Sequence, residues 1–167
     1  MKHIIALAIS AAAALSAAAL DVESSAGSLR EAVGASTGAS ELKVRGSVNA
    51  ADLMFIQSEM ASLTSLDLSE AVLAEYSGDP LLNSVASSPA GAIPPAAFLG
   101  MRLATFAFPS NTTSIGEGAF AATALTAAVV PQGVTFVGNS AYADCPALVS
   151  ASVPASVSRL GSGVFRG

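Results

Sequence analysis

Few side chains of this sequence could perform chemistry, and the paired carboxylates are the first to consider. Asp67 comes three residues before Glu70, and Glu75 comes four residues before Asp79. Glycoside cleavage needs two carboxyl groups about 5 Å or more apart in a cleft, and a calcium loop alternates several oxygen ligands over about a dozen residues. The sequence around these pairs indicates neither arrangement, so we interpret the acids as a solvated rim.

Histidine and cysteine each occur once, which narrows the chemistry further. His3 is the histidine and Cys145 is the cysteine. A Ser-His-Asp or Cys-His arrangement and the common zinc sites need a histidine in the folded chain. We therefore predict no catalytic residue, no metal site and no cofactor, and we predict that the protein is not an enzyme. Cys145 is expected to pack as a buried small hydrophobic residue.

The first 20 residues, MKHIIALAISAAAALSAAAL, have the organisation of a secretory signal peptide. A lysine precedes an apolar run at residues 4–14, and small residues follow. We predict a signal peptide at residues 1–19, with cleavage after Ala17 or Ala19. The alternative is a membrane anchor, but the apolar stretch is 17 residues long and contains two serines, against roughly 20 residues needed to span a bilayer.

Composition and charge exclude some partners. The chain is 52% hydrophobic and 11% charged, whereas globular domains carry roughly 25% charged residues. Loss of the leader leaves six Lys and Arg against 12 Asp and Glu, a net charge of −6. Neither half forms a basic patch, so we expect no nucleic acid partner, and no later segment is apolar enough to span a membrane. We place the protein outside the cytoplasm, secreted or on the cell surface.

Residue types recur every 22 to 23 positions in the second half of the chain. Copies begin at Ile93, Ile115 and Val137, and a truncated fourth copy begins at Leu160. The three full copies read aliphatic-Gly-x-x-Ala-aromatic and then Leu, with Pro94 replacing the Gly in the first copy. Equal periods stack equal residues, and stacked copies bury the apolar face that a single copy cannot. We expect a column of rings formed by Phe98, Phe120, Tyr142 and Phe165.

Each of the three full copies also contains a short segment in which residues alternate, and a proline follows it. The segments are TFAF, AAVV and SASV. A period of two predicts strands, and proline ends each strand because it cannot donate to the ladder. The inward pairs are expected to be Phe106 with Phe108, Ala128 with Val130, and Ala151 with Val153, while tight turns are expected at Gly116, Gly138 and Gly161.

The first half of the chain carries the same strand pattern in LTSLDLS at residues 63–69, and more weakly in LKV at residues 42–44. We therefore assign repeats to residues 63–167, with an insertion at about 72–92 that we predict as a surface loop. Residues 20–62 are predicted to form an N-terminal cap with two helices. Ser28 and Glu31 have the spacing of a capping box for the first helix, and Asn49 is the expected N-cap of the second.

These patterns resemble the BspA-like leucine-rich-repeat family of secreted and cell-surface proteins. The IGEGAF start, the Cys-x-x-Leu step at Cys145 and Leu148, and the strand that ends in proline carry the resemblance. It covers roughly residues 25–167 and implies extracellular binding rather than catalysis. We predict an α/β-type leucine-rich-repeat solenoid of mostly short parallel strands and few short helices, with an N-terminal helical cap and an open C-terminal end.

Solenoids bind partners on extended concave faces, so the outward residues of the strands form the candidate binding face. This row is polar and charged at its N-terminal end and carries small residues further on. It consists of Lys43, Arg45, Ser65, Asp67, Thr105, Ala107, Ala127, Val129, Ser150 and Ser152.

We interpret the protein as a bacterial adhesion or binding module for an extracellular protein or glycan of a host or neighbouring cell. The alternative is a structural element that self-associates through its uncapped C-terminal repeat, because an uncapped strand edge favours association.

Overall fold

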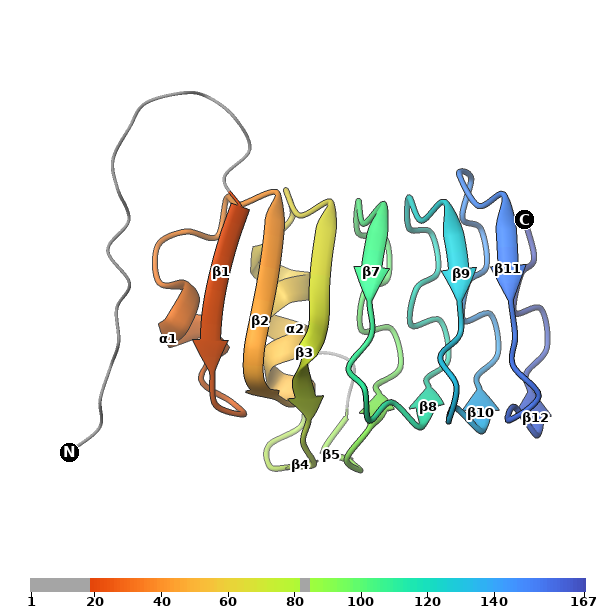
Figure 1. The fold of residues 1–167 in the computed structure, drawn as a ribbon, viewed down its shortest axis with the longest axis horizontal. Coiled ribbons are helices and arrows are strands. Elements are labelled where there is room, and N and C mark those ends of the chain that lie inside the picture. The colour runs from red at the N-terminus through yellow and green to blue at the C-terminus, as the bar shows by residue number, and fades with distance from the viewer. Residues whose placement is uncertain (1–18, 82–84) are drawn as a thin grey trace.

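The computed structural model describes residues 19–81 and 85–167. Short strands stack along one axis into a solenoid, and two helices lie near its N-terminal end (Figure 1). The elements are β1 (Ala19–Ser24), α1 (Leu29–Val33), β2 (Glu41–Val48), α2 (Ala50–Glu59), β3 (Ser65–Leu73), β4 (Tyr76–Ser77), β5 (Ser87–Ser88), β6 (Ala92–Ile93), β7 (Thr105–Ala107), β8 (Ser114–Ile115), β9 (Ala127–Val129), β10 (Phe136–Val137), β11 (Ser150–Ser152) and β12 (Arg159–Leu160).

All described strands except β4 and β5 form two rows. One row contains a four-stranded parallel sheet, β1-β2-β3-β7, and a two-stranded parallel sheet, β9-β11. We call it the strand row, and its six strands lie side by side in Figure 1. The other row is a parallel sheet in the order β6-β8-β10-β12. The predicted solenoid of short parallel strands with few helices is confirmed.

The predicted column of aromatic rings forms the centre of the C-terminal half. Phe98 stacks on Phe120 with ring centroids 5.2 Å apart, and Phe120 stacks on Tyr142 at 5.1 Å. Tyr142 stacks on Phe165 at 5.7 Å. Offset or tilted ring pairs at such distances stabilise a core beyond the area that they bury. The column therefore holds successive repeats in register.

The glycines at positions 116, 138 and 161 are needed for a different reason from the one expected. They do not have the positive φ angles that a tight turn at glycine often uses. A Cβ on Gly138 would instead lie 2.5 Å from the backbone nitrogen of Glu117, and one on Gly161 would lie 2.5 Å from that of Asn139. Each glycine therefore allows the backbones of two adjacent repeats to approach closely.

Two other positions of each repeat have the left-handed backbone conformation. One is occupied by Ala96, Gly118, Ser140 and Gly163, with φ of 54°, 59°, 52° and 61°. The other is occupied by Gly100, Ala122 and Asp144, with φ of 72°, 56° and 55°. Residues with a Cβ are strained in this region by about 1–2 kcal/mol. The repeat therefore tolerates local strain at positions where glycine would fit better.

The segment predicted as an N-terminal helical cap contributes strands as well as helices. β1 and β2 pair in parallel along six residue positions, and β2 pairs with β3. The sheet of the strand row therefore continues through residues 20–62. Its first element among the described residues is the strand β1, not a helix (Figure 1). The predicted signal peptide lies outside the described residues except for Ala19, which begins β1.

The second helix begins as predicted, but the first does not. The Asn49 side chain accepts hydrogen bonds from the backbone of Ala51 and Asp52, and its backbone donates to the Asp52 carboxylate, which completes a capping box. The predicted box of Ser28 with Glu31 is wrong, because the Ser28 side chain makes no capping hydrogen bond. The carboxylate of Asp52, a residue that is 3% exposed, caps the first helix instead.

Asp52 joins the two helices through its carboxylate. Its Oδ2 accepts from the backbone nitrogen of Gly27 at 2.7 Å, and its Oδ1 accepts from that of Leu29 at 2.9 Å. The first backbone N–H groups of a helix have no partner inside the helix, so this acceptor from α2 satisfies the start of α1. A carboxylate at a helix N-terminus also interacts favourably with the helix dipole.

The insertion at about 72–92 forms an antiparallel pair of two-residue strands, β4 and β5, rather than a loop throughout. Asn111, in the following repeat, contacts the end of β3, where the insertion begins. Its side chain accepts from the backbone nitrogen of Leu73 at 2.9 Å and donates to the carbonyl oxygen of Leu73 at 2.9 Å. The carbonyl oxygen of Leu73 also accepts from the backbone nitrogen of Gly91 at 2.9 Å, so the Asn111 side chain ties Leu73 to the next repeat in addition to this backbone contact.

Candidate functional site

The ten predicted binding residues lie on the strands of the strand row, and their register pairs them across it. Lys43 lies opposite Asp67, and Ser65 lies opposite Thr105. The Thr105 hydroxyl lies 2.8 Å from the Ser65 hydroxyl. Further along the row, Ala127 pairs with Ser150 and Val129 pairs with Ser152. All ten residues are exposed or half-buried, which here are Lys43, Arg45, Ser65, Asp67, Thr105, Ala107, Ala127, Val129, Ser150 and Ser152.

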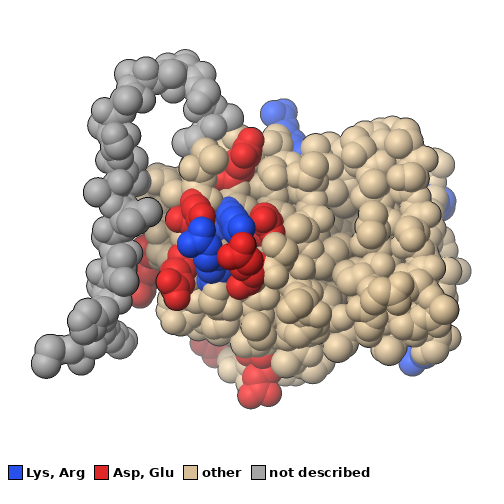
Figure 2. Space-filling model, in the orientation of Figure 1, with Lys and Arg blue, Asp and Glu red and all other residues tan. Residues whose placement is uncertain are grey.

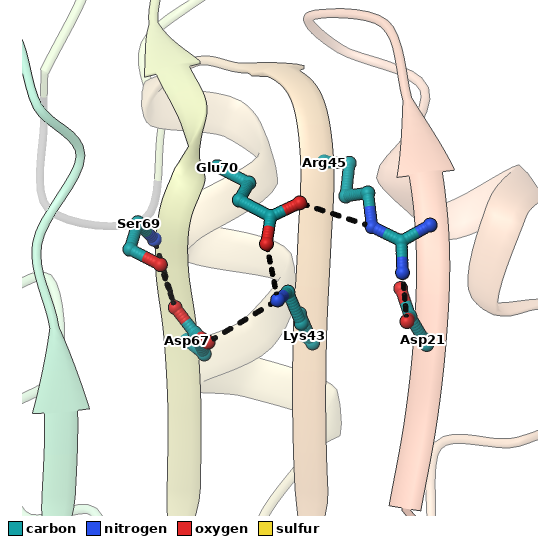
Figure 3. A network of polar contacts seen from close by, with 6 residues as sticks. All are labelled: Asp21, Lys43, Arg45, Asp67, Ser69 and Glu70. Carbon is teal, nitrogen blue, oxygen red and sulfur yellow. Dashed lines mark hydrogen bonds and ion pairs between the residues drawn. The ribbon is translucent and has the colours of Figure 1, made fainter.

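The charged residues gather over β1, β2 and β3, whereas the rest of this face is almost free of charge (Figure 2). The Lys43 ammonium contacts Glu70 at 2.5 Å and Asp67 at 3.8 Å. The Arg45 guanidinium contacts Glu70 at 3.2 Å and also pairs with Asp21 (Figure 3). Three carboxylates and two cations thus form one network that joins three strands.

A shift in strand register produces this network. Lys43 lies opposite Asp67, but Arg45 lies opposite Glu70, because β3 has an irregularity between these two positions. Glu70 therefore lies within reach of both cations (Figure 3). Glu70 was not among the predicted face residues, since a fixed alternation of two residues does not anticipate the shift. Asp21 was missed because residues 20–62 were predicted as a helical cap, whereas β1 pairs with β2.

Hydrogen bonds at the network favour the charged forms of Lys43, Asp67 and Glu70. The hydrogen bond from Lys43, together with its charge, lowers the pKa of Glu70, and the same contact raises the pKa of Lys43. Hydrogen bonds from the Ser69 hydroxyl and backbone lower the pKa of Asp67. Exposed ion pairs contribute little stability, at about 0–1 kcal/mol each. The network mainly fixes the side chains, so the predicted residues Lys43, Arg45 and Asp67 are already paired within the chain.

The strand row is interrupted between β7 and β9. Val149 donates its backbone N–H to Thr126 at 3.0 Å, and Ala104 donates to Thr64 at 2.8 Å. Across the described residues, no backbone hydrogen bond joins residues 104–108 to residues 126–130. The ten predicted residues therefore belong to two sheets rather than one, and a wider space separates β7 from β9 in Figure 1.

A cavity of about 190 Å³ lies at this interruption. We call it the β7–β9 slot. Residues of both strands and of the aromatic column line it, and none of them is charged. They are Ala104, Thr105, Phe106, Phe108, Phe120, Leu125, Thr126, Ala127, Ala128, Val129 and Tyr142. A second hollow of about 450 Å³ lies between β5 and the row β6-β8-β10.

No arrangement typical of an active site or a metal centre stands out among the described residues. No group of three or more His, Cys, Asp and Glu side chains in residues 19–81 and 85–167 is placed to hold a metal ion. Cys145 is half-buried rather than fully buried as expected, and its thiol donates to the carbonyl oxygen of Phe120 at 3.2 Å. In the same part of the chain, none of the helices has the length and hydropathy to cross a bilayer.

The fold defines a class, a solenoid of short parallel strands in which the repeats from β3 onward each contribute one strand to each of two rows. Residues 76–167, more than half of the chain, match the model of the BspA type leucine-rich-repeat region in six copies. The protein belongs to this family, which confirms the resemblance in the sequence. Membership of the family supports a protein-binding repeat module. A comparison with curated proteins gave no match.

Proposed function

We propose that this protein is a secreted or surface-exposed bacterial binding module that adheres to extracellular proteins or glycans of a host or neighbouring cell. The observation that carries the proposal is the strand row, on which exposed side chains of successive repeats lie in register. Such a surface contacts an extended partner along several repeats at once. The proposal includes no catalytic step and no cofactor.

The proposal is tested by measuring the binding of the purified protein to intact cells, extracellular matrix proteins and glycans. A double variant, Thr105→Arg with Val129→Arg, places two long charged side chains on the strand row. Both residues are exposed, and Val129 is 61% exposed, so the fold should tolerate the change. The control is Thr135→Arg, which changes an exposed residue next to β10 in the other row.

We expect the double variant to weaken binding at least tenfold and the control to change it less than twofold. Equal losses in both variants would place the contact elsewhere on the molecule. An absence of binding to every surface component would contradict the proposed function itself.

Self-association through the last described repeat is a second candidate, favoured by the apolar side chains exposed there. Val149 is 87% exposed, Leu160 is 55% exposed and Val153 is 40% exposed. Within the described residues, β11 and β12 are each paired on one side only. Sedimentation of the protein at high concentration tests this candidate. A monomer under these conditions would exclude it, and dissociation of a dimer by Leu160→Glu would support it.

A further inference from the structure

We propose that the β7–β9 slot binds an extended, uncharged peptide segment of a partner protein. The peptide backbone would pair with the facing edges of β7 and β9, and one apolar side chain would enter the slot. This inference rests on the proposed function, because it names the class of partner and the part of the strand row that contacts it.

The slot opens on one side of the solenoid only. In the other row, Gly116 donates its backbone N–H to Ile93 at 2.9 Å, and β6 remains paired with β8. At the aromatic column, the backbone N–H of Phe98 donates to Ala119 at 2.8 Å. The same two repeats that separate at β7 and β9 therefore stay joined elsewhere, so the slot has a fixed back and an open front.

Two bulky side chains account for the opening. Phe106 and Phe108 occupy the inward positions of β7 and the residue after it, where the next copy has Ala128 and Val130. Their rings lie 4.9 Å and 5.5 Å from the ring of Phe120, and 4.7 Å from each other. Both side chains are half-buried. Protein interiors have little free volume, so these rings hold β7 away from β9.

The two facing strand edges carry polar backbone groups that pair with nothing across the slot. Backbone groups at the edge of a sheet are a template for a further strand, and proteins that bind extended peptides often use such edges. Here two edges face each other across a floor of aromatic rings. The ligand that matches both features has a regular backbone of donors and acceptors and an apolar side chain, which is an extended peptide.

The lining of the slot argues against other ligands. A glycan needs many polar partners for its hydroxyl groups, and the lining provides three hydroxyl side chains, Thr105, Thr126 and the buried Tyr142. A charged peptide would meet no opposite charge, because the charged network lies over β1, β2 and β3 (Figure 2). Neighbouring strands lie about 4.8 Å apart, so a peptide strand paired with both edges would hold β7 and β9 about 9.6 Å from each other.

The test uses a blocked synthetic peptide, LTAAVVPQ, with the sequence of residues 125–132. This sequence pairs in parallel as β9 in the protein, and β7 has a free edge of the kind that pairs with it. The probe is titrated into the full protein, and its binding is followed through the amide resonances and through hydrogen exchange. We expect both to change at residues 104–108 and 126–130, with slower exchange of these amides.

Two matched variants locate the contact. Ala127→Arg places a charged side chain in the slot, and Ser150→Arg changes its register partner on β11, which does not line the slot. Both residues are exposed, so neither change should disturb the core. We expect Ala127→Arg to weaken peptide binding at least tenfold and Ser150→Arg to change it less than twofold. The same peptide with methyl groups on alternate backbone nitrogens should not bind.

The inference is overturned if the probe does not bind up to its solubility limit, if both variants weaken binding equally, or if the methylated peptide binds as well. The proposed function is judged separately. A cell-surface partner that is lost in Ser150→Arg but retained in Ala127→Arg would refute the slot and support the strand row, because Ser150 lies on the strand row outside the slot. Peptide binding without any surface partner would support the slot and contradict the proposed function.

Discussion

Replacement of Asp52 by alanine should be among the most damaging single changes to this fold. The Asp52 carboxylate is almost fully buried and accepts three backbone hydrogen bonds, from Gly27, Leu29 and Asn49 at 2.7 Å, 2.9 Å and 2.9 Å. Two of them fix the start of α1, and the third belongs to the capping box of α2. A single side chain therefore holds both helices of the N-terminal half.

The magnitude follows from the charge of the acceptor and from the donors left behind. A hydrogen bond to a charged group stabilises a fold by about 1.5–3 kcal/mol, and a buried donor left without a partner costs about 1–3 kcal/mol. Three bonds share one carboxylate, so their losses overlap. We expect Asp52→Ala to lower the free energy of unfolding by about 3–5 kcal/mol, a large part of the about 5–15 kcal/mol that typical proteins have.

Urea denaturation followed by circular dichroism measures the change, and Glu31→Ala is the control. Glu31 is exposed and occupies the position that sequence spacing alone would assign to a capping box with Ser28. Exposed substitutions of this kind change stability by about 0.5 kcal/mol or less. A loss below 1 kcal/mol in Asp52→Ala, or an equal loss in Glu31→Ala, would refute the assignment of the cap to Asp52.

Three further substitutions test the core and the repeat backbone. The Tyr142 hydroxyl is buried without a hydrogen-bond partner, so Tyr142→Phe should raise the free energy of unfolding by about 1 kcal/mol. Burial also raises the pKa of Tyr142, so the native protein keeps its phenol protonated while the unfolded chain ionises. Denaturation from pH 8 to 11 should show the native protein losing up to about 1.4 kcal/mol per pH unit above about pH 10 relative to Tyr142→Phe, and parallel curves would contradict this. Ala122→Gly relieves the positive φ of 56° and should raise stability by up to about 1 kcal/mol, whereas Ala155→Gly, outside that region, should lower it. Asn111→Ala removes both hydrogen bonds to Leu73 and should lower the melting temperature through a loss of about 2 kcal/mol, with Asn111→Asp between the two.

The repeat architecture is predictable because its period converts directly into contacts. Residues 22 or 23 apart in sequence become neighbours in the stack, so the rings of Phe120 and Tyr142 lie 5.1 Å apart as the pattern requires. The alternation of AAVV and SASV likewise becomes the pair β9 and β11. The tight turn predicted at Gly138 was the wrong reason for this glycine. The glycine is nevertheless required, because the backbones of two repeats approach closely there.

Other features depend on contacts between segments that are not separated by the repeat period of 22 or 23 residues. Asp52 caps α1 from 25 residues away along the chain, and short-range spacing favoured Ser28 instead. The network of Lys43 and Arg45 depends on a register shift in β3. Phe106 and Phe108 are visible in the sequence as larger than their counterparts, but the separation of β7 from β9 follows from how their rings pack.

The strand row is best understood as two surfaces with different capacities for binding. Over β1, β2 and β3, each cation is already paired with carboxylates of the same chain, so a charged partner would have to displace these contacts. At the β7–β9 slot the situation is reversed, because the half-buried rings of Phe106 and Phe108 and two strand edges are accessible and no charge competes. Removal of apolar surface from water stabilises a complex in proportion to the buried area, whereas an exchange of exposed ion pairs gains little. If the protein binds a partner along this row, the affinity should therefore come mainly from the slot, and raising the salt concentration should change it little.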